Sequence, residues 1–146
     1  MNTTTVAAFE NTLQKTNLWL KDLLFELEWH ETDYHRAYHA MRAVLHALRD
    51  RLSLEEAADL AAQLPMLIRG TYYEGWRPAN VPARGRSAGD FLTRVADEYQ
   101  DDMSANAEEV TRAVFRLLSM HISAGEIQDV QRCLPSEIRE LWNERP

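Results

Sequence analysis

The stretch that decides the fold is Arg42–Tyr72, RAVLHALRDRLSLEEAADLAAQLPMLIRGTY, which recurs as Arg112–Trp142, RAVFRLLSMHISAGEIQDVQRCLPSEIRELW. The two stretches are identical at 11 of 31 aligned positions. Because the shared positions include serine, proline and charged residues as well as apolar ones, they indicate a repeated structural unit rather than a common composition. We therefore predict that the chain contains two copies of one unit.

The apolar residues follow helical spacing. In the segment before Ser53, one face of a helix about 120° wide at 100° per residue collects Tyr34, Ala37, Tyr38, Met41, Val44, Leu45 and Leu48. No segment shows the alternation of apolar and polar residues that is typical of a half-buried strand. The sequence therefore predicts an all-α protein.

The repeat extends toward the N-terminus in both copies. At an offset of 72 residues, Trp19, Leu20, Leu23 and Leu27 correspond to Phe91, Leu92, Val95 and Tyr99. We predict two tandem pseudo-symmetric multi-helix repeats packed into one compact, bundle-like domain that spans residues 1–146. Repeat one covers about 6–73, an aromatic and basic connecting loop about 73–87, and repeat two about 88–142.

Charge and composition restrict the possible functions. The chain has 16 basic and 23 acidic residues, a net charge of −7 and a pI near 5.2, which oppose general affinity for nucleic acid and for anionic membranes. The single cysteine, Cys133, cannot form an internal disulfide, and no basic leader with an apolar segment opens the chain. The apolar runs are too short to span a bilayer. We expect a cytoplasmic protein that does not insert into membranes.

Four repeated polar residues have the spacing of helix caps. Ser53 with Glu56, and Ser123 with Glu126, match the capping box, in which the hydroxyl and the carboxylate each accept from a free backbone amide. An alternative interpretation is a pair of carboxylates for acid–base chemistry. We prefer the structural interpretation, because a catalytic site in two symmetric copies would be unusual in so small a fold.

The remaining repeated charges suggest ion pairs. Arg69 and Arg139 follow Asp59 and Asp129 by ten residues across a proline corner, so each arginine is predicted to fold back on its aspartate. Arg42 and Arg112 are the rival partners for the same carboxylates.

The connecting loop is the best candidate for recognition. The segment from Gly70 to Gly89, which includes this loop, contains four of the five glycines and two of the five prolines, with interleaved aromatic and basic residues. Such residues can stack on bases, bind phosphorylated ligands or anchor a protein partner. The candidate residues are Tyr73, Trp76, Arg77, Arg84 and Arg86. The alternative is that Trp76 packs between the two copies.

A metal site is a weaker possibility. His35 and His39 are one turn apart on a predicted helix, a spacing that can chelate a transition metal. His46 lies too far along the helix to join them. We therefore predict that His35, His39, Arg42, His46 and Arg49 form a solvated polar face, and we expect no metal.

Several segments resemble a prokaryotic family, domain-of-unknown-function family 2267. They are Arg42–Leu52, Ala62–Met66, Arg69–Gly70, Tyr73–Pro78, Gly125–Ile127, Leu134–Pro135 and Leu141–Trp142, and the similarity runs from about Thr16 onward. The resemblance supports the helical interpretation. It implies no activity, so no catalytic or ligand-binding residue is carried over from it.

The resulting hypothesis is a non-enzymatic, cytoplasmic helical module that binds another protein or associates with itself. No nucleophile elbow, phosphate-binding glycine loop, dinucleotide fingerprint or Cys-x-x-Cys motif is present, so we expect no cofactor. One alternative is binding of an anionic ligand or nucleic acid through the arginines of the 69–86 segment. A second alternative is an enzyme with an unrecognised site.

Overall fold

The computed structural model describes residues 6–99 and 106–143, which are helical apart from short connections. No strand occurs in these residues, so the predicted all-α class is confirmed. The elements are α1 (Ala7–Leu27), α2 (Tyr34–Arg49), α3 (Leu54–Ala62), α4 (Met66–Tyr73), the 3₁₀ turn η1 (Pro78–Asn80), α5 (Ala88–Glu98), α6 (Ala107–His121), α7 (Ala124–Cys133), α8 (Ser136–Arg139) and the 3₁₀ turn η2 (Glu140–Trp142).

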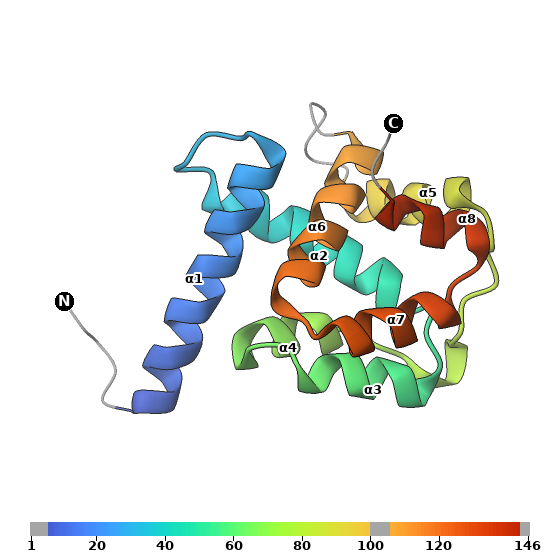
Figure 1. Cartoon of the computed structure of the whole chain (residues 1–146), viewed down its shortest axis with the longest axis horizontal. Coiled ribbons are helices and arrows are strands. Elements are labelled where there is room, and N and C mark those ends of the chain that lie inside the picture. Colours follow the sequence, from blue (N-terminus) through green and yellow to red (C-terminus); the bar gives the residue numbers. More distant parts are fainter. Residues whose placement is uncertain (1–5, 100–105, 144–146) are drawn as a thin grey trace.

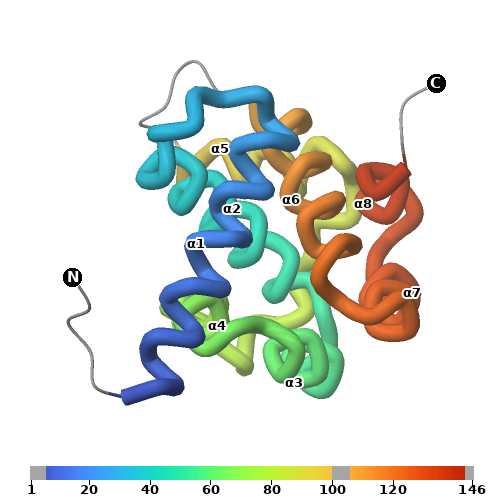
Figure 2. The backbone as a smooth tube through the Cα atoms, turned by 60° about the vertical axis from the view of Figure 1, so that its left-hand side comes forward, coloured from blue at the N-terminus to red at the C-terminus, as the bar shows by residue number. Residues whose placement is uncertain are grey.

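The helices α2 and α6 pack against each other at the centre of the molecule (Figures 1 and 2). Both α1 and α5 contact this central pair, and α4 packs on α2 while η2 packs on α6. The helices α3 and α7 lie side by side at one end of the bundle (Figures 1 and 2). The chain is therefore a compact helical bundle in which residues far apart in sequence meet.

The central position of α2 follows from its side chains. Its apolar face buries Met41, Val44 and Leu48, and small alanines on the same helix allow neighbouring helices to approach closely. Each large apolar side chain that is fully buried contributes roughly 1.5–3 kcal/mol to the hydrophobic free energy of folding. From Ala37 onward the apolar face predicted from the helical spacing packs in the core, whereas Tyr34 at its start is 36% exposed.

The serines cap their helices, whereas the glutamates do not complete the capping boxes. Ser53 Oγ accepts a hydrogen bond from the Glu56 amide at 3.1 Å, and Ser123 Oγ accepts one from the Glu126 amide at 3.2 Å. Neither glutamate carboxylate accepts from its serine amide. The complete capping box is found instead at the start of α5, where it is formed by Ser87 and Asp90. The two glutamate carboxylates instead lie close to each other between α3 and α7.

Both proline corners end in aromatic residues. At the first, the Tyr72 hydroxyl donates to the Ala57 carbonyl at 2.9 Å, and burial raises the pKa of Tyr72 so that the phenol keeps its proton. At the second, Trp142 stacks on Phe115 with the ring centroids 3.7 Å apart. Each aromatic therefore closes a corner of the core.

We predict that Leu48→Ala lowers the free energy of unfolding by about 2–5 kcal/mol, because Leu48 is fully buried and its truncation leaves a cavity. Leu54→Ala is the matched control, since Leu54 is 51% exposed, and we expect it to change the free energy by less than about 0.5 kcal/mol. Urea denaturation followed by circular dichroism measures both. Equal losses in the two variants would contradict the assignment of the core.

Candidate functional site

The predicted ion pairs between Arg69 and Asp59 and between Arg139 and Asp129 are wrong. Arg69 donates from Nη2 to the Leu64 carbonyl at 3.0 Å, and Arg139 donates from Nη2 to the Leu134 carbonyl at 3.0 Å. The physical reason lies in the proline corner. It ends α3 and α7 abruptly, and each arginine donates a guanidinium N–H to the carbonyl of the leucine that precedes the proline.

Arg42 and Arg112, the alternative partners predicted for the two aspartates, also bind other groups. Arg42 pairs with Glu74 and Glu98. Arg112 lies 3.6 Å from Glu108 and donates to the Asn143 carbonyl at 2.6 Å.

The two aspartates themselves lie on the surface. In the described part of the chain Asp129 pairs with Arg132, its neighbour one turn along α7, at 3.1 Å, and Asp59 forms no ion pair. The arginines and aspartates therefore belong to separate environments, although their spacing in the sequence is the same in both copies.

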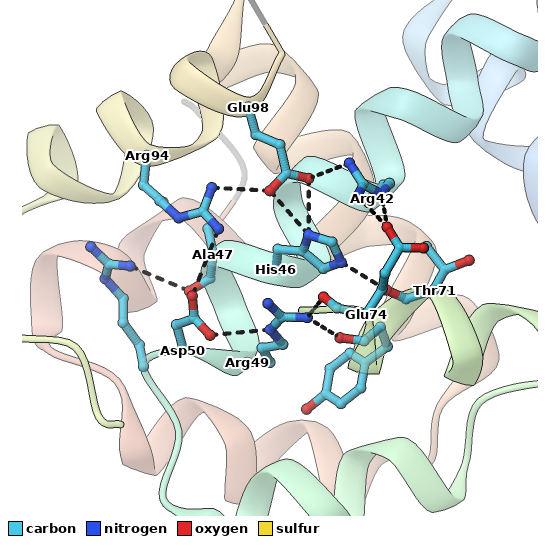
Figure 3. A network of polar contacts seen from close by, with 11 residues as sticks. Arg42, His46, Ala47, Arg49, Asp50, Thr71, Glu74, Arg94 and Glu98 are labelled. Atoms are coloured by element: carbon cyan, nitrogen blue, oxygen red, sulfur yellow. Dashed lines mark hydrogen bonds and ion pairs between the residues drawn. The ribbon is translucent and has the colours of Figure 1, made fainter. Parts of the chain in front are cut away.

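A buried polar network joins α2 to the end of α4 and to α5 (Figure 3). At its centre His46 is 3% exposed, with Nδ1 at 2.9 Å from the Glu98 carboxylate and Nε2 at 2.7 Å from the Thr71 carbonyl. Because both partners only accept hydrogen bonds, the ring satisfies both only when each nitrogen carries a hydrogen. The histidine therefore acts as a bridge between two helices in this structure.

Arg49 occupies the same interior and holds the end of α4. Its Nη1 donates to the Tyr72 and Glu74 carbonyls, both at 2.6 Å, and its Nε donates to Asp50 at 3.1 Å (Figure 3). The prediction of a solvated polar face is thus wrong for His46 and Arg49. The two side chains are buried because of tertiary packing: α4 and α5 cover the polar side of α2 and supply hydrogen-bond partners for these groups.

Glu98 is the acidic centre of the network. Its carboxylate meets His46, Arg94 at 3.0 Å and Arg42 at 3.3 Å (Figure 3). Burial by itself would raise the pKa of Glu98, but the hydrogen bonds and positive charges of His46 and Arg94 outweigh it and hold the pKa below its usual value. These titratable groups satisfy one another, which fits a structural clamp better than a reactive centre.

The connecting loop has a packed aromatic part and an exposed basic part. Trp76 is half-buried against the core, and its ring centroid lies 5.3 Å from that of Tyr73. In contrast, Arg77, Arg84 and Arg86 are exposed, and none of them forms an ion pair with another described residue. The loop candidates are therefore not one site, because the aromatics serve packing while the arginines face solvent.

The two histidines proposed as a weak metal site do lie together. Their Nε2 atoms are 3.1 Å apart on the exposed side of α2, where one ring can donate to the other. Within residues 6–99 and 106–143, no third histidine, cysteine or carboxylate joins His35 and His39 to form a group of ligands.

One apolar stripe on α1 is buried at one end and exposed at the other. Its C-terminal part, with Leu20, Leu23 and Leu24, lies in the core, whereas its N-terminal part is exposed: Val6 is 46%, Phe9 51% and Leu13 46% exposed. In Figure 1 these first turns of α1 lie at the edge of the molecule. The stripe continues beyond the core that buries it, which is a feature of interaction surfaces.

An open groove of about 660 Å³ adjoins the same half of α1. Asn11, Thr12 and Lys15 of α1 form one wall, and the corner between α3 and α4, with Gln63 and Met66, forms the other. The Leu67 amide donates to Thr12 Oγ1 at 3.0 Å and fixes the two walls relative to each other. The groove therefore has a defined shape, but Val6, Phe9 and Leu13 do not line it.

A cluster of carboxylates forms where α3 meets α7. Glu56, Asp59 and Glu126 each place an oxygen within 4.8 Å of the others. The sequence showed the same Glu-x-x-Asp spacing in both copies, but it contained no signal that the two copies meet at these residues. Their proximity is a property of the tertiary structure alone.

A comparison with family models assigns most of the chain to one family. Residues 16–141 match the model of a family described as an uncharacterized conserved protein, DUF2267. No curated protein matches the chain. Within its described residues, the structure contains no helix with the length and apolar character needed to cross a membrane.

We predict that Glu98→Gln lowers the free energy of unfolding at pH 7 by about 1–3 kcal/mol, because His46 and Arg94 lose a charged partner. The folded-state pKa of Glu98 is depressed, so its contribution is present above the ordinary glutamate pKa and is lost as the pH falls through the lowered value. The difference between wild type and variant should therefore shrink in acid. Asp97→Asn, which changes the exposed neighbouring acid, is the control. Urea denaturation at pH 7 and pH 3 gives the comparison, and a difference independent of pH would contradict the role of the charge.

Proposed function

Since the chain belongs to the DUF2267 family, a family of uncharacterized conserved proteins, we propose a function from its own geometry: it is a helical interaction module that associates with a second copy of itself. The observation that carries this proposal is the exposed half of the α1 stripe, formed by Val6, Phe9 and Leu13. The proposed role is binding rather than catalysis, because the buried titratable groups around His46 and Glu98 are occupied by one another.

The stripe is suited to a helical partner. Phe9 and Leu13 are four residues apart and lie on the same face of α1, with Val6 one turn before them. Exposed apolar residues at this spacing match the anchors that an amphipathic helix uses when it packs into another helix. In a symmetric dimer the same patch serves both subunits, so one stripe is sufficient for both sides of the interface.

Local charge supports association with a second copy. The whole chain has a net charge of −7, so contact between most parts of its surface would bring like charges together. The segment 6–18, however, contains one acid and one base, Glu10 and Lys15. This segment therefore carries no net charge, so two copies that meet through it do not repel each other there.

We predict that the wild-type protein dimerises with rising concentration and that Phe9→Asp weakens the dimer at least tenfold, because a charge replaces an apolar contact. Phe25→Asp is the matched control, since Phe25 is 82% exposed on the same helix but lies outside the stripe, and it should leave the dimer unchanged. Sedimentation velocity over a range of concentrations measures the association.

Circular dichroism checks that both variants keep the helical content of the wild type. A wild-type protein that stays monomeric at every concentration would contradict self-association. Equal weakening by both substitutions would instead remove the stripe as its cause.

We further infer that the fold is a tandem pseudo-symmetric duplication. The contacts between helices recur when each helix is replaced by its counterpart in the other half. The helix α1 packs on α2 and α6, and its counterpart α5 packs on α6 and α2. Likewise, α1 packs on α4, and α5 packs on α8. The helices α2 and α6, and likewise α3 and α7, pack against their own counterparts. This pattern of contacts supports a two-fold relation between the halves.

Equivalent side chains support the same inference. Arg69 and Arg139 each donate to the carbonyl five residues earlier, Leu64 and Leu134, at the same distance of 3.0 Å. Ser53 and Ser123 each accept from the amide three residues later. Local contacts of this kind are expected when one ancestral unit has been doubled.

A second candidate function is recognition of an anionic ligand by the basic part of the loop. The observation in its favour is that Arg77, Arg84 and Arg86 are exposed and form no ion pair in the described part of the chain. Surface arginines without carboxylate partners are available for phosphate groups. The acidic remainder of the chain opposes this function, so we place it second.

If the loop binds anions, the double variant Arg84→Ala, Arg86→Ala should lose most of the affinity for a single-stranded oligonucleotide, and wild-type binding should weaken steeply with salt. Arg132→Ala is the control, because Arg132 is equally exposed but lies on α7. Fluorescence anisotropy at low and physiological salt measures both. An affinity that is the same in the double variant and the control would exclude the loop.

A further inference from the structure

We propose that Glu56, Asp59 and Glu126 bind one divalent cation of the size and hardness of Ca²⁺ between α3 and α7. Each of these residues provides a carboxylate oxygen within 4.8 Å of the other two. Carboxylate oxygens are the ligands that hard divalent cations prefer. The proposal rests on this geometry and is independent of the interaction function proposed above.

The decisive observation is a buried oxygen that lacks a partner. Glu126 is 8% exposed, and among the described residues no N–H or hydroxyl group donates to its Oε2, so the hydrogen bond left to it is through a proton shared with Glu56. The Oε2 atom of Glu56, on the facing helix, is also buried without a donor. Buried polar atoms in folded proteins are almost always paired, so two unpaired carboxylate oxygens that face each other require an explanation.

No basic side chain in the described part of the chain neutralises these charges. Within residues 6–99 and 106–143, no lysine, arginine or histidine forms an ion pair with Glu56, Asp59 or Glu126. Ionised carboxylates that are buried together without a cation are strongly unfavourable. The charge must therefore be reduced by a species from solvent, either a proton or a metal cation.

A proton on Glu126 would compete with a cation for this site. Burial, together with the hydrogen bond and charge of Glu56 and the charges of Asp59 and Asp129, raises the pKa of Glu126 to about 8. A bound cation would displace this proton, because metal ligands must be deprotonated. Cation affinity is therefore expected to increase with pH up to about pH 8.

The three proposed ligands come from two helices that pack against each other, α3 and α7. Glu56 and Asp59 are three residues apart and share a face of α3, while Glu126 comes from the first turn of α7. Gln63 at the end of α3 exchanges two hydrogen bonds with Ser123 at the start of α7, at 3.1 and 2.9 Å, and fixes the two helices relative to each other. The ligands are thus held by rigid elements.

The spacing fits Ca²⁺ better than Mg²⁺. Oxygens on opposite sides of Ca²⁺ lie about 4.6–5.2 Å apart, whereas those around Mg²⁺ lie only about 4.0–4.2 Å apart. The three carboxylate oxygens lie within 4.8 Å of one another, a spread that the larger and more flexible coordination shell of Ca²⁺ accommodates better than the rigid octahedron of Mg²⁺. Asp59 is exposed, so the site is open on one side and waters can complete the coordination shell.

Calorimetric titration of the EDTA-treated full chain with CaCl₂, and separately with MgCl₂, tests the proposal. We expect one equivalent of Ca²⁺ to bind, more tightly than Mg²⁺ and more tightly at pH 8 than at pH 6. Glu126→Gln should weaken Ca²⁺ at least tenfold, because the amide keeps the shape of the side chain but not its charge. Glu109→Gln, which removes an exposed glutamate on α6, should bind Ca²⁺ like the wild type.

Thermal denaturation without metal distinguishes a cation site from two carboxyls that share a proton. The raised pKa of Glu126 means that the metal-free wild type loses stability as the pH rises from about 4.5 to about 8, and Glu126→Gln removes that loss. If the cation proposal is right, Ca²⁺ restores the melting temperature of the wild type at pH 8 and does not change that of Glu126→Gln. Absence of saturable Ca²⁺ binding, or binding that Glu126→Gln leaves unchanged, would overturn the proposal.

Discussion

The structure depends on the burial of α2 from both sides. Residues 43–49 are all buried, and the run includes His46 and Arg49 as well as apolar side chains. Charged groups are tolerated inside a protein only when partners replace water. Here the partners are the last carbonyls of α4 and the carboxylate of Glu98 on α5. The network therefore sets where α4 and α5 can lie against the central helix pair.

This arrangement leaves two regions of the described residues on which we base the proposed interactions. The first turns of α1 extend an apolar stripe past the core that buries its other end, so Phe9 and Leu13 stay exposed. Between α3 and α7, Glu126 and Glu56 bring buried carboxylate oxygens together without a protein cation. The first region is suited to another helix and the second to a small ion. Neither region overlaps the network around His46, whose groups satisfy one another.

Local features were predictable from sequence because each depends on neighbouring residues. The all-α class follows from apolar spacing, and the roles of Ser53 and Ser123 follow from an amide three residues away. The ion pairs were not predictable in the same way. Arg69 and Asp59 have a suitable spacing, but the Ala61 and Leu64 carbonyls at the end of α3 accept from the guanidinium instead. Charge complementarity in sequence does not identify the acceptor that lies within reach.

By itself, the sequence determined which segments form helices, where α3 and α7 begin and which helix faces are apolar, because these properties arise within a few residues of chain. Only the tertiary structure decided that His46 and Arg49 are buried rather than solvated, that Trp76 packs while Arg84 and Arg86 remain exposed, and that Glu56 meets Glu126. These outcomes depend on which helices cover one another. Helical periodicity describes the faces of a helix, whereas the partner of each face is selected by the packing of the whole chain.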